Sequence, residues 1–152
     1  VQGQTNAMKL SIIIPAHNEA ATIGQVLEKV AAVDIGAWKK EVIAVNDGSG
    51  DNTGGLIEKW ASSRNGEGRL EVQIIHHKKN LGKGAAIRSA LERVTGDYIL
   101  IQDADLEYDP NDIPNLLLSI SKSDADSGQA VVFGKRGYKH NRGQRAFCFN
   151  AV

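Results

Sequence analysis

The chain has 152 residues, of which 41% are hydrophobic and 24% are charged, and its formal net charge is zero. These values are typical of one globular domain, and they exclude a disordered or fibrous protein. The single cysteine, Cys148, excludes an internal disulfide framework and argues against a Cys/His metal site. No apolar run approaches the roughly 20 residues that span a bilayer, and residues 1–7 lack the apolar stretch of a signal peptide. We therefore expect a protein of the reducing cytoplasm.

The first predicted element is a buried strand at 10–14, where a β-branched run ends at Pro15. Further strands are predicted at 42–45, 70–74, 98–101 and 131–133, and the alternating third strand is expected near a sheet edge. Between them, apolar residues recur at helical spacing and predict helices over 23–30, 56–61, 87–94 and 113–120. Three of these helices have expected caps, which are Asn18, Asp51 or Asn52, and Asp109 followed by Pro110. No periodicity predicts an element after 133.

The alternation of strands and helices predicts an α/β fold with a mainly parallel sheet and helices on both faces. In such sheets, ligands bind at the carboxyl ends of the strands. Polar segments follow the first, second and fourth predicted strands, at 15–19, 47–53 and 103–107. We therefore expect the functional site at that edge of the sheet.

Asp103, Ala104 and Asp105 directly follow the fourth predicted strand. In an extended segment the carboxylates of Asp103 and Asp105 point the same way, and they repel unless a cation joins them. Carboxylate oxygens suit Mg²⁺ or Mn²⁺, and Glu107 is a candidate third ligand. The alternative is a solvated acidic turn.

Asp47, at the end of the second predicted strand, can accept hydrogen bonds from the edge of a nucleobase. Its alternative role is an Asx turn or a helix cap. His17 follows Pro15 and either stacks on a base or is a bystander. The segment Asn80 to Gly84 opens the third predicted helix, where glycines and Lys83 favour phosphate. It lacks the spacing of a Walker loop, so turn formation and helix packing remain the alternative.

Four blocks in order resemble the signature of family 2 glycosyltransferases: residues 11–19, 45–53, 80–84 and 96–110. The last block, with residues 132–136 after it, is similar to the branch that contains dolichyl- and undecaprenyl-phosphate mannose or glucose synthases. The resemblance implies a GT-A, Rossmann-like fold that is truncated at its C-terminus. It also implies binding of a UDP- or GDP-sugar together with Mg²⁺ or Mn²⁺. His17 departs from the aromatic residue that is usual at its position.

The resemblance implies a role for each matching residue. Asp103, Asp105 and Arg136 are the expected catalytic residues, of which Arg136 would contact phosphate. The expected metal ligands are Asp103, Asp105 and Glu107. The expected donor-binding residues are Pro15, Ala16, His17, Glu19, Asp47, Gly48, Ser49, Lys83, Asp103, Ala104 and Asp105.

The expected function is inverting transfer of a sugar to an acceptor, with a polyprenyl phosphate at the cytoplasmic face of a membrane as the favoured acceptor. The alternatives are a nucleotide-binding module without turnover and, third, a sugar-phosphate nucleotidyltransferase. A nucleotidyltransferase of that kind would need a glycine-rich, basic loop directly after the first strand. The segment 15–19 is neither glycine-rich nor basic. No nucleic-acid partner is expected.

The expected organisation is a leader or cloning remnant at 1–7, a nucleotide-sugar-binding subdomain at 8–136, and a basic tail at 137–152. All five charged residues from Lys135 onward are basic, which indicates either an anionic partner or a solvated terminus. We also expect the sheet to be unfinished on one side, because family members extend further. An open edge favours a homo-oligomer, with Phe133, Phe147 and Phe149 as candidate contacts, and the chain alone is expected to be inactive.

Overall fold

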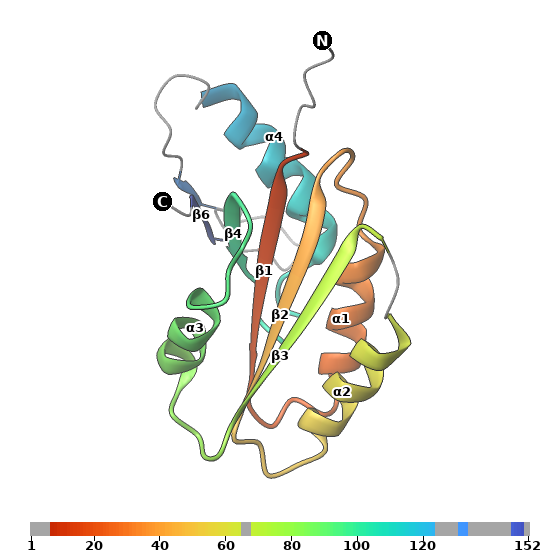
Figure 1. Cartoon of the computed structure of the whole chain (residues 1–152), viewed down its shortest axis with the longest axis vertical. Coiled ribbons are helices and arrows are strands. Elements are labelled where there is room, and N and C mark those ends of the chain that lie inside the picture. The colour runs from red at the N-terminus through yellow and green to blue at the C-terminus, as the bar shows by residue number, and fades with distance from the viewer. Residues whose placement is uncertain (1–6, 65–67, 124–130, 134–146, 151–152) are drawn as a thin grey trace.

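The computed structural model describes residues 7–64, 68–123, 131–133 and 147–150. Their strands form one sheet in the order β3-β2-β1-β4-β6-β5 (Figure 1). The first four strands in the chain are parallel to one another, whereas β6 pairs antiparallel with both β4 and β5. The strands are β1 (Lys9–Ala16), β2 (Lys39–Asp47), β3 (Leu70–His77), β4 (Tyr98–Ile101), β5 (Val131–Phe133) and β6 (Phe147–Asn150).

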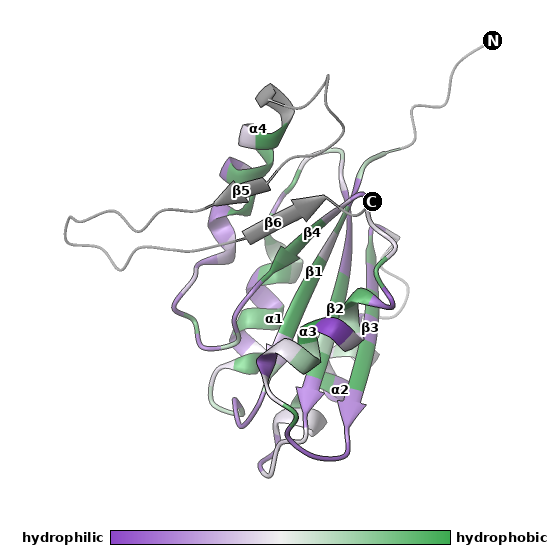
Figure 2. Cartoon of the chain, turned by 90° about the vertical axis from the view of Figure 1, so that its left-hand side faces the viewer, coloured by the Kyte–Doolittle hydropathy of each residue, from purple (hydrophilic) through white to green (hydrophobic). Residues whose placement is uncertain are grey.

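Helices cover both faces of the sheet, as the sequence predicts (Figure 1). One face packs against α1, α2 and α4, and the other against α3, which Figure 2 shows lying across the sheet. The helical segments are α1 (Ile23–Ala32), α2 (Thr53–Ser63), α3 (Lys83–Leu91), the 3₁₀ turn η1 (Pro110–Asp112) and α4 (Ile113–Ser123). Within the described segments, no helix is long and apolar enough to cross a membrane.

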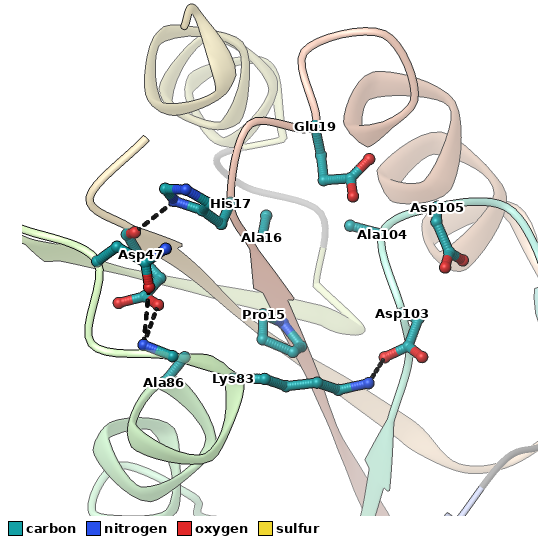
Figure 3. Close-up of a pocket in the computed structure, with 12 residues that line it drawn as sticks. Pro15, Ala16, His17, Glu19, Asp47, Lys83, Ala86, Asp103, Ala104 and Asp105 are labelled. Carbon is teal, nitrogen blue, oxygen red and sulfur yellow. Dashed lines mark hydrogen bonds and ion pairs between the residues drawn. The ribbon is translucent and has the colours of Figure 1, made fainter. Parts of the chain in front are cut away.

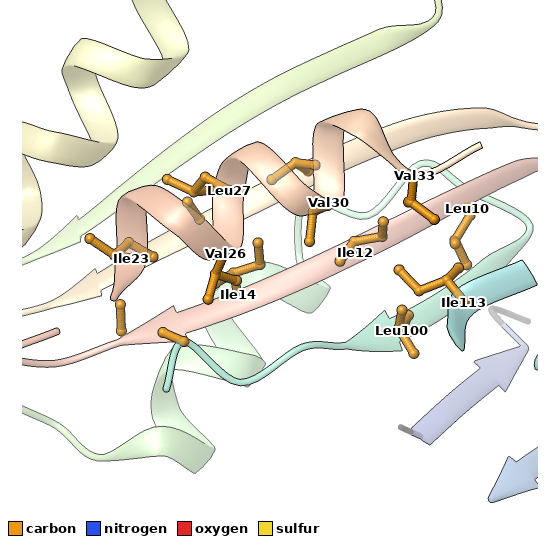
Figure 4. Packing of buried hydrophobic residues seen from close by; sticks show 14 of the residues in the cluster. Leu10, Ile12, Ile14, Ile23, Val26, Leu27, Val30, Val33, Leu100 and Ile113 are labelled. Carbon is orange, nitrogen blue, oxygen red and sulfur yellow. The ribbon is translucent and has the colours of Figure 1, made fainter. Parts of the chain in front are cut away.

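Side-chain alternation along β1 divides the core between the two faces. Ile12 and Ile14 belong to the larger cluster with α1, whereas Ile13 packs on the α3 side. The apolar stripe of α1, which includes Val26 and Val30, is fully buried against the first of these faces (Figure 4). Parallel strands buried on both faces read as continuous apolar runs, which explains the uninterrupted isoleucines of β1.

The expected caps have different outcomes. Asp109 caps η1 through a hydrogen bond from the Asn111 amide, and Asp51 accepts from the Thr53 amide at the start of α2. The prediction for Asn18 is wrong, because α1 begins only at Ile23. Asn18 has a φ of 55° and its Oδ1 accepts from the Gly50 amide, so its side chain joins two loops.

The sheet extends further than the sequence indicates. Beside β4 the sheet continues, because β6 pairs with it, with Leu100 opposite Cys148. The strand β5 is outermost on that side, and the expected open edge stays a prediction. The sequence does not predict β6, because residues 147–150 contain no β-branched residue, in contrast to the valines of the predicted strand at 131–133. At the opposite end, β3 is the outermost strand, which confirms its expected position.

Glu41 is a fully buried carboxylate on the α3 side of β2. It accepts hydrogen bonds from the Ser11 hydroxyl, from Gln73 Nε2 at 2.9 Å, and from the Thr95 amide and hydroxyl at 3.0 and 2.7 Å. Burial raises the pKa of Glu41, but these hydrogen bonds lower it by more, so the pKa lies below its ordinary value. The ionised carboxylate therefore stabilises the junction of β1, β2, β3 and the turn before β4.

We expect Glu41→Gln to lower the free energy of unfolding at pH 7 by about 1–3 kcal/mol, because an amide cannot accept all these donors. Since the folded pKa of Glu41 is lowered, its stabilisation is complete above the ordinary value of 4.5 and is lost as pH falls through the folded pKa. Urea unfolding at several pH values should thus show a smaller acid loss in the variant. Glu71 lies opposite Glu41 on β3 and is exposed, so Glu71→Gln is the matched control. Equal losses in both variants would contradict the role of Glu41.

Candidate functional site

A cavity of about 280 Å³ lies at the carboxyl ends of β1, β2 and β4, where the sequence predicts the site (Figure 3). Figure 2 shows that the ends of β2 and β3 and the loops after them are hydrophilic. The lining residues are Pro15, Ala16, His17, Glu19, Asp47, Asn80, Gly82, Lys83, Ala86, Asp103, Ala104 and Asp105.

The cavity brings together most of the expected donor-binding residues. Gly48 and Ser49 are the exceptions, since neither lines it. Ala86 lines it although no pattern in the sequence marked it, because a small residue on a helix has many structural uses. The predicted catalytic residue Arg136 lies outside the described residues.

The loop after β4 presents two carboxylates around a buried alanine. Ala104 is buried, whereas Asp103 is half-buried and Asp105 is exposed. Gln102, which is also buried, donates from Nε2 to the carbonyl oxygens of Asp103 at 3.2 Å and Tyr108 at 3.0 Å. Gln102 therefore fixes the loop from inside, a role that the sequence did not reveal because glutamine carries no distinctive signal at a strand end.

Lys83, the first residue of α3, reaches across the cavity to Asp103 (Figure 3). Its Nζ lies 2.5 Å from Asp103 Oδ1. The lysine side chain is 56% exposed, so the pair contributes at most about 1 kcal/mol to stability. The pair matters instead for its position, because it places the ammonium group of Lys83 beside Asp103 at the cavity.

The expected three-carboxylate metal set does not assemble. Among the described residues, no group of three His, Cys, Asp or Glu side chains is placed to hold a metal ion. Asp105 Oδ1 accepts a hydrogen bond from the Glu107 amide, and Leu106 between them has a φ of 62°, so the chain turns sharply there. Glu107 as a third ligand therefore stays a prediction.

Two carboxylates at a cavity still fit a divalent cation of the expected kind. Mg²⁺ is usually held by one or two carboxylates together with phosphate oxygens of the substrate, and not by an all-protein cage. Asp103 and Asp105 line the cavity and suit that donor set. The chemistry of the site thus fits a cation that binds together with a diphosphate.

Asp47 is almost fully buried at the end of β2. Its Oδ1 accepts from His77 Nδ1 at 2.7 Å and from the Leu81 amide at 2.9 Å, and its Oδ2 accepts from the Gly82 amide at 2.8 Å. Burial raises the pKa of Asp47, but the hydrogen bonds from His77, Leu81 and Gly82 and the charge of His77 lower it by more. Asp47 is thus ionised, and it fixes the turn that leads into α3.

His17 is held at the cavity in a defined orientation. Its Nδ1 lies 2.8 Å from the Asp47 carbonyl oxygen, and its Nε2 lies 3.2 Å from Asn18 Nδ2. A carbonyl oxygen only accepts, so Nδ1 carries the proton and Nε2 accepts from the amide. The ring is therefore fixed at the cavity wall, and its stacking on a base stays a prediction.

Gly48 is needed for a close approach of two loops. Its φ is 61°, and a Cβ there would lie 2.2 Å from the Lys79 carbonyl carbon and 2.4 Å from the Asn80 nitrogen. Gly48 therefore lets the loop after β2 support the segment before α3 that carries Asn80 and Gly82.

We expect Gly48→Ala to lower the free energy of unfolding by about 1–3 kcal/mol more than Gly36→Ala does. Gly36 is the matched control, because its φ is 66° but no heavy atom lies within 4 Å of a Cβ there. Both substitutions cost backbone strain, and only Gly48→Ala adds the clash. Chemical denaturation of the two variants measures the difference. Equal losses in the free energy of unfolding would show that the two loops move apart without cost and that Gly48 is not needed for their close approach.

The family to which the chain belongs follows from its sequence, since the model of "Glycosyl transferase family 2" matches residues 11–150. The chain belongs to glycosyltransferase family 2. The match includes all four blocks on which the resemblance was based, and it continues past residue 136, to the end of β6.

Curated relatives of this family 2 chain include enzymes named for polyprenyl phosphates. A dodecaprenyl-phosphate galacturonate synthase of Rhizobium johnstonii is 31% identical over 121 residues, which cover 79% of this chain and 35% of the relative. An undecaprenyl-phosphate 4-deoxy-4-formamido-L-arabinose transferase of Shewanella sediminis is 38% identical over 109 residues, which cover 71% of this chain and 32% of the relative. The chain spans about a third of the length of these two relatives.

The fold is that of solved glycosyltransferases. A mannosyltransferase from Pyrobaculum calidifontis, in complex with GDP-Man and Mn²⁺, superposes with a TM-score of 0.73 and is 23% identical. The match covers 96% of this chain and 45% of that structure. The expected GT-A fold is thereby confirmed.

Proposed function

We propose that this chain binds a UDP- or GDP-sugar in the cavity at the ends of β1, β2 and β4. The observation that carries the proposal is the placement of Asp47 at one end of the cavity and of Asp103 and Asp105 at the other. Asp47 supplies an acceptor for the base, and the two carboxylates supply a place for the cation and diphosphate. A mannosyltransferase of the same fold was solved with a nucleotide sugar and Mn²⁺, which supports the choice of ligand.

The proposed reaction is inverting transfer of the sugar. Asp103 and Asp105 would hold the cation, which would supply positive charge to neutralise the leaving diphosphate. Lys83 begins α3 at the cavity and is close enough to Asp103 to bind phosphate there. Gln102 keeps both carboxylates in place through the loop backbone. Arg136 as a phosphate contact and Glu107 as a further ligand remain expectations from the family resemblance.

We propose a polyprenyl phosphate at the cytoplasmic face of a membrane as the acceptor. Relatives that are 31% and 38% identical are named for dodecaprenyl and undecaprenyl phosphate. A phosphate acceptor is already anionic near neutral pH, so the reaction needs no strong general base.

A thermal-shift panel of nucleoside diphosphates and their sugars, with Mn²⁺ or with EDTA, tests the proposed ligand. At one hundred times the dissociation constant, a bound nucleotide stabilises the fold by about 2.7 kcal/mol, which raises the melting temperature by roughly 5 to 10 °C. We expect the largest shifts with UDP or GDP compounds and Mn²⁺. Equal shifts with ADP and CDP would contradict specific recognition, and no shift with any of them would contradict the proposal.

We further propose that the 152-residue chain by itself binds donor without transferring sugar. Alignment of donor and acceptor can lower a barrier by up to roughly 7–11 kcal/mol, and the chain spans only about a third of two relatives named for polyprenyl phosphates. In a radiolabelled assay with polyprenyl phosphate, we expect no product above background from the chain and normal product from a full-length relative. Turnover by the chain would contradict this prediction, and donor binding without turnover would agree with it.

A further inference from the structure

The carboxylate of Asp47 has few unused hydrogen-bond acceptor positions, called places below, for a ligand. A carboxylate oxygen accepts about two hydrogen bonds in its plane. Oδ1 already accepts from His77 Nδ1 and the Leu81 amide, so both of its places are used. Among the residues that the structure describes, only the Gly82 amide donates to Oδ2, which leaves one acceptor position. Asp47, which lines the cavity, therefore offers a single acceptor site there.

His77 is the side chain that takes the second place on Oδ1. Its side chain is only 9% exposed, and its Nε2 lies 2.9 Å from the Ser89 hydroxyl on α3. A carboxylate only accepts, so Nδ1 of His77 carries a proton, and Nε2 lies within hydrogen-bond distance of the Ser89 hydroxyl. Partners on both sides hold the imidazole in place. The other two donors to Asp47 are backbone amides, so His77 alone can change this pattern by substitution.

The common bases differ in the donors that they present to such an acceptor. Proteins read a base by hydrogen bonds to its pairing edge. Uracil presents one ring N–H there, between two carbonyl groups. Guanine presents two neighbouring donors, a ring N–H and an amino group, which match both oxygens of a carboxylate. Adenine and cytosine present an amino donor next to a ring nitrogen that accepts, and a carboxylate repels that ring nitrogen.

We propose that His77 sets the base preference of this site in favour of uracil. This inference rests on the proposed function, which leaves open whether the donor carries UDP or GDP. With one free place on Asp47, uracil satisfies its single N–H. Guanine would leave its second donor buried without a partner, and such a loss weakens binding strongly.

Titration calorimetry with UDP and GDP, each with Mn²⁺, tests the inference on the intact chain. We expect UDP to bind at least about tenfold more tightly than GDP, which corresponds to 1.4 kcal/mol. In His77→Leu, which frees a place on Oδ1, the ratio should fall to about threefold or less, through tighter binding of GDP. In His77→Asn, the amide nitrogen can take the place of imidazole Nδ1, so the ratio should remain.

Two controls separate this role from a general loss of structure. His76 is the neighbouring residue on β3, and it contacts Asn46 and Glu58 away from the cavity, so His76→Leu should keep the ratio. Ser89→Ala should keep it as well, because the hydrogen bond to Asp47 remains. Circular dichroism melts establish whether each variant is folded. If His77→Leu is unfolded, the ratio of UDP to GDP affinity in the wild-type chain and in His77→Asn still tests the inference.

The outcomes distinguish this inference from the proposed function. Equal or tighter binding of GDP by the wild-type chain would overturn the preference for uracil while leaving nucleotide binding intact. An unchanged ratio in folded His77→Leu would overturn the role of His77. Absence of binding by both nucleotides would overturn the proposed function and this inference with it.

Discussion

Asp105→Asn should abolish the gain in nucleoside diphosphate affinity that Mn²⁺ provides, a loss of roughly 10- to 100-fold in the presence of the metal. The substitution keeps the shape of the side chain but removes its charge, and a neutral amide oxygen is a poorer ligand for a hard cation. Asp105 is exposed and accepts one hydrogen bond, from the Glu107 amide. We therefore expect stability to change by no more than about 0.5 kcal/mol.

Calorimetry with Mn²⁺ and with EDTA separates the metal contribution from nucleotide binding. In EDTA, the variant and the wild-type chain should bind UDP or GDP with similar affinity. Glu107→Gln is the matched control two residues away, and a small effect is expected because Glu107, unlike Asp105, does not line the cavity. If Asp105→Asn kept the full gain in affinity with Mn²⁺, Asp105 would not be a metal ligand. If Glu107→Gln lost that gain, Glu107 would be a ligand.

Asp47→Asn should weaken both the fold and nucleotide binding. Asparagine replaces one acceptor oxygen with a donor, which then faces a donor of His77, Leu81 or Gly82. We expect a loss of about 2–4 kcal/mol in the free energy of unfolding, measured with urea. Because the carboxylate is a proposed base acceptor, nucleotide affinity should also fall by about 1.5–3 kcal/mol, and by the same amount with and without Mn²⁺.

Asp51→Asn is the control for the removal of a charge from the same loop. Asp51 is exposed, does not line the cavity, and accepts from Thr53 and from the Ala20 amide. The Asp51→Asn variant should lose some stability but keep its affinity for nucleotides. If Asp47→Asn instead lost only its response to Mn²⁺, Asp47 would belong to the metal and not to the base.

The sequence predicted the fold from signals that are local. Strand and helix signals differ, so short apolar or alternating runs located the first four strands, and apolar residues at helical spacing located the helices between them. The carboxyl-end rule for parallel sheets then placed the site near Asp47 and Asp103 before any geometry was known. Both predictions depend on residues that lie close together in the chain, which is why they were accessible.

Features that depend on tertiary contacts were not accessible from the sequence. Asparagine is a common capping residue, but the side-chain oxygen of Asn18 instead accepts a hydrogen bond from the backbone amide of Gly50, in the loop after β2. Gln102 and His77 act through partners that the fold brings to them, and neither has a spacing that would reveal its role. The strand β6 becomes a strand through pairing with β4 and β5, not through its own pattern.

An NMR titration of the ¹⁵N-labelled chain with a nucleoside diphosphate and Mg²⁺ tests the location of the site most directly. We expect amide shifts to concentrate in residues 15–19, 80–83 and 103–105, which line the cavity at the carboxyl ends of the strands. A second, more apolar cavity at the other end of the sheet, between Ile35, Trp38 and Leu117, provides an internal control and should show no shifts. Shifts that centre on this second cavity, or shifts at Asp103 to Asp105 that are the same with and without Mg²⁺, would contradict the account.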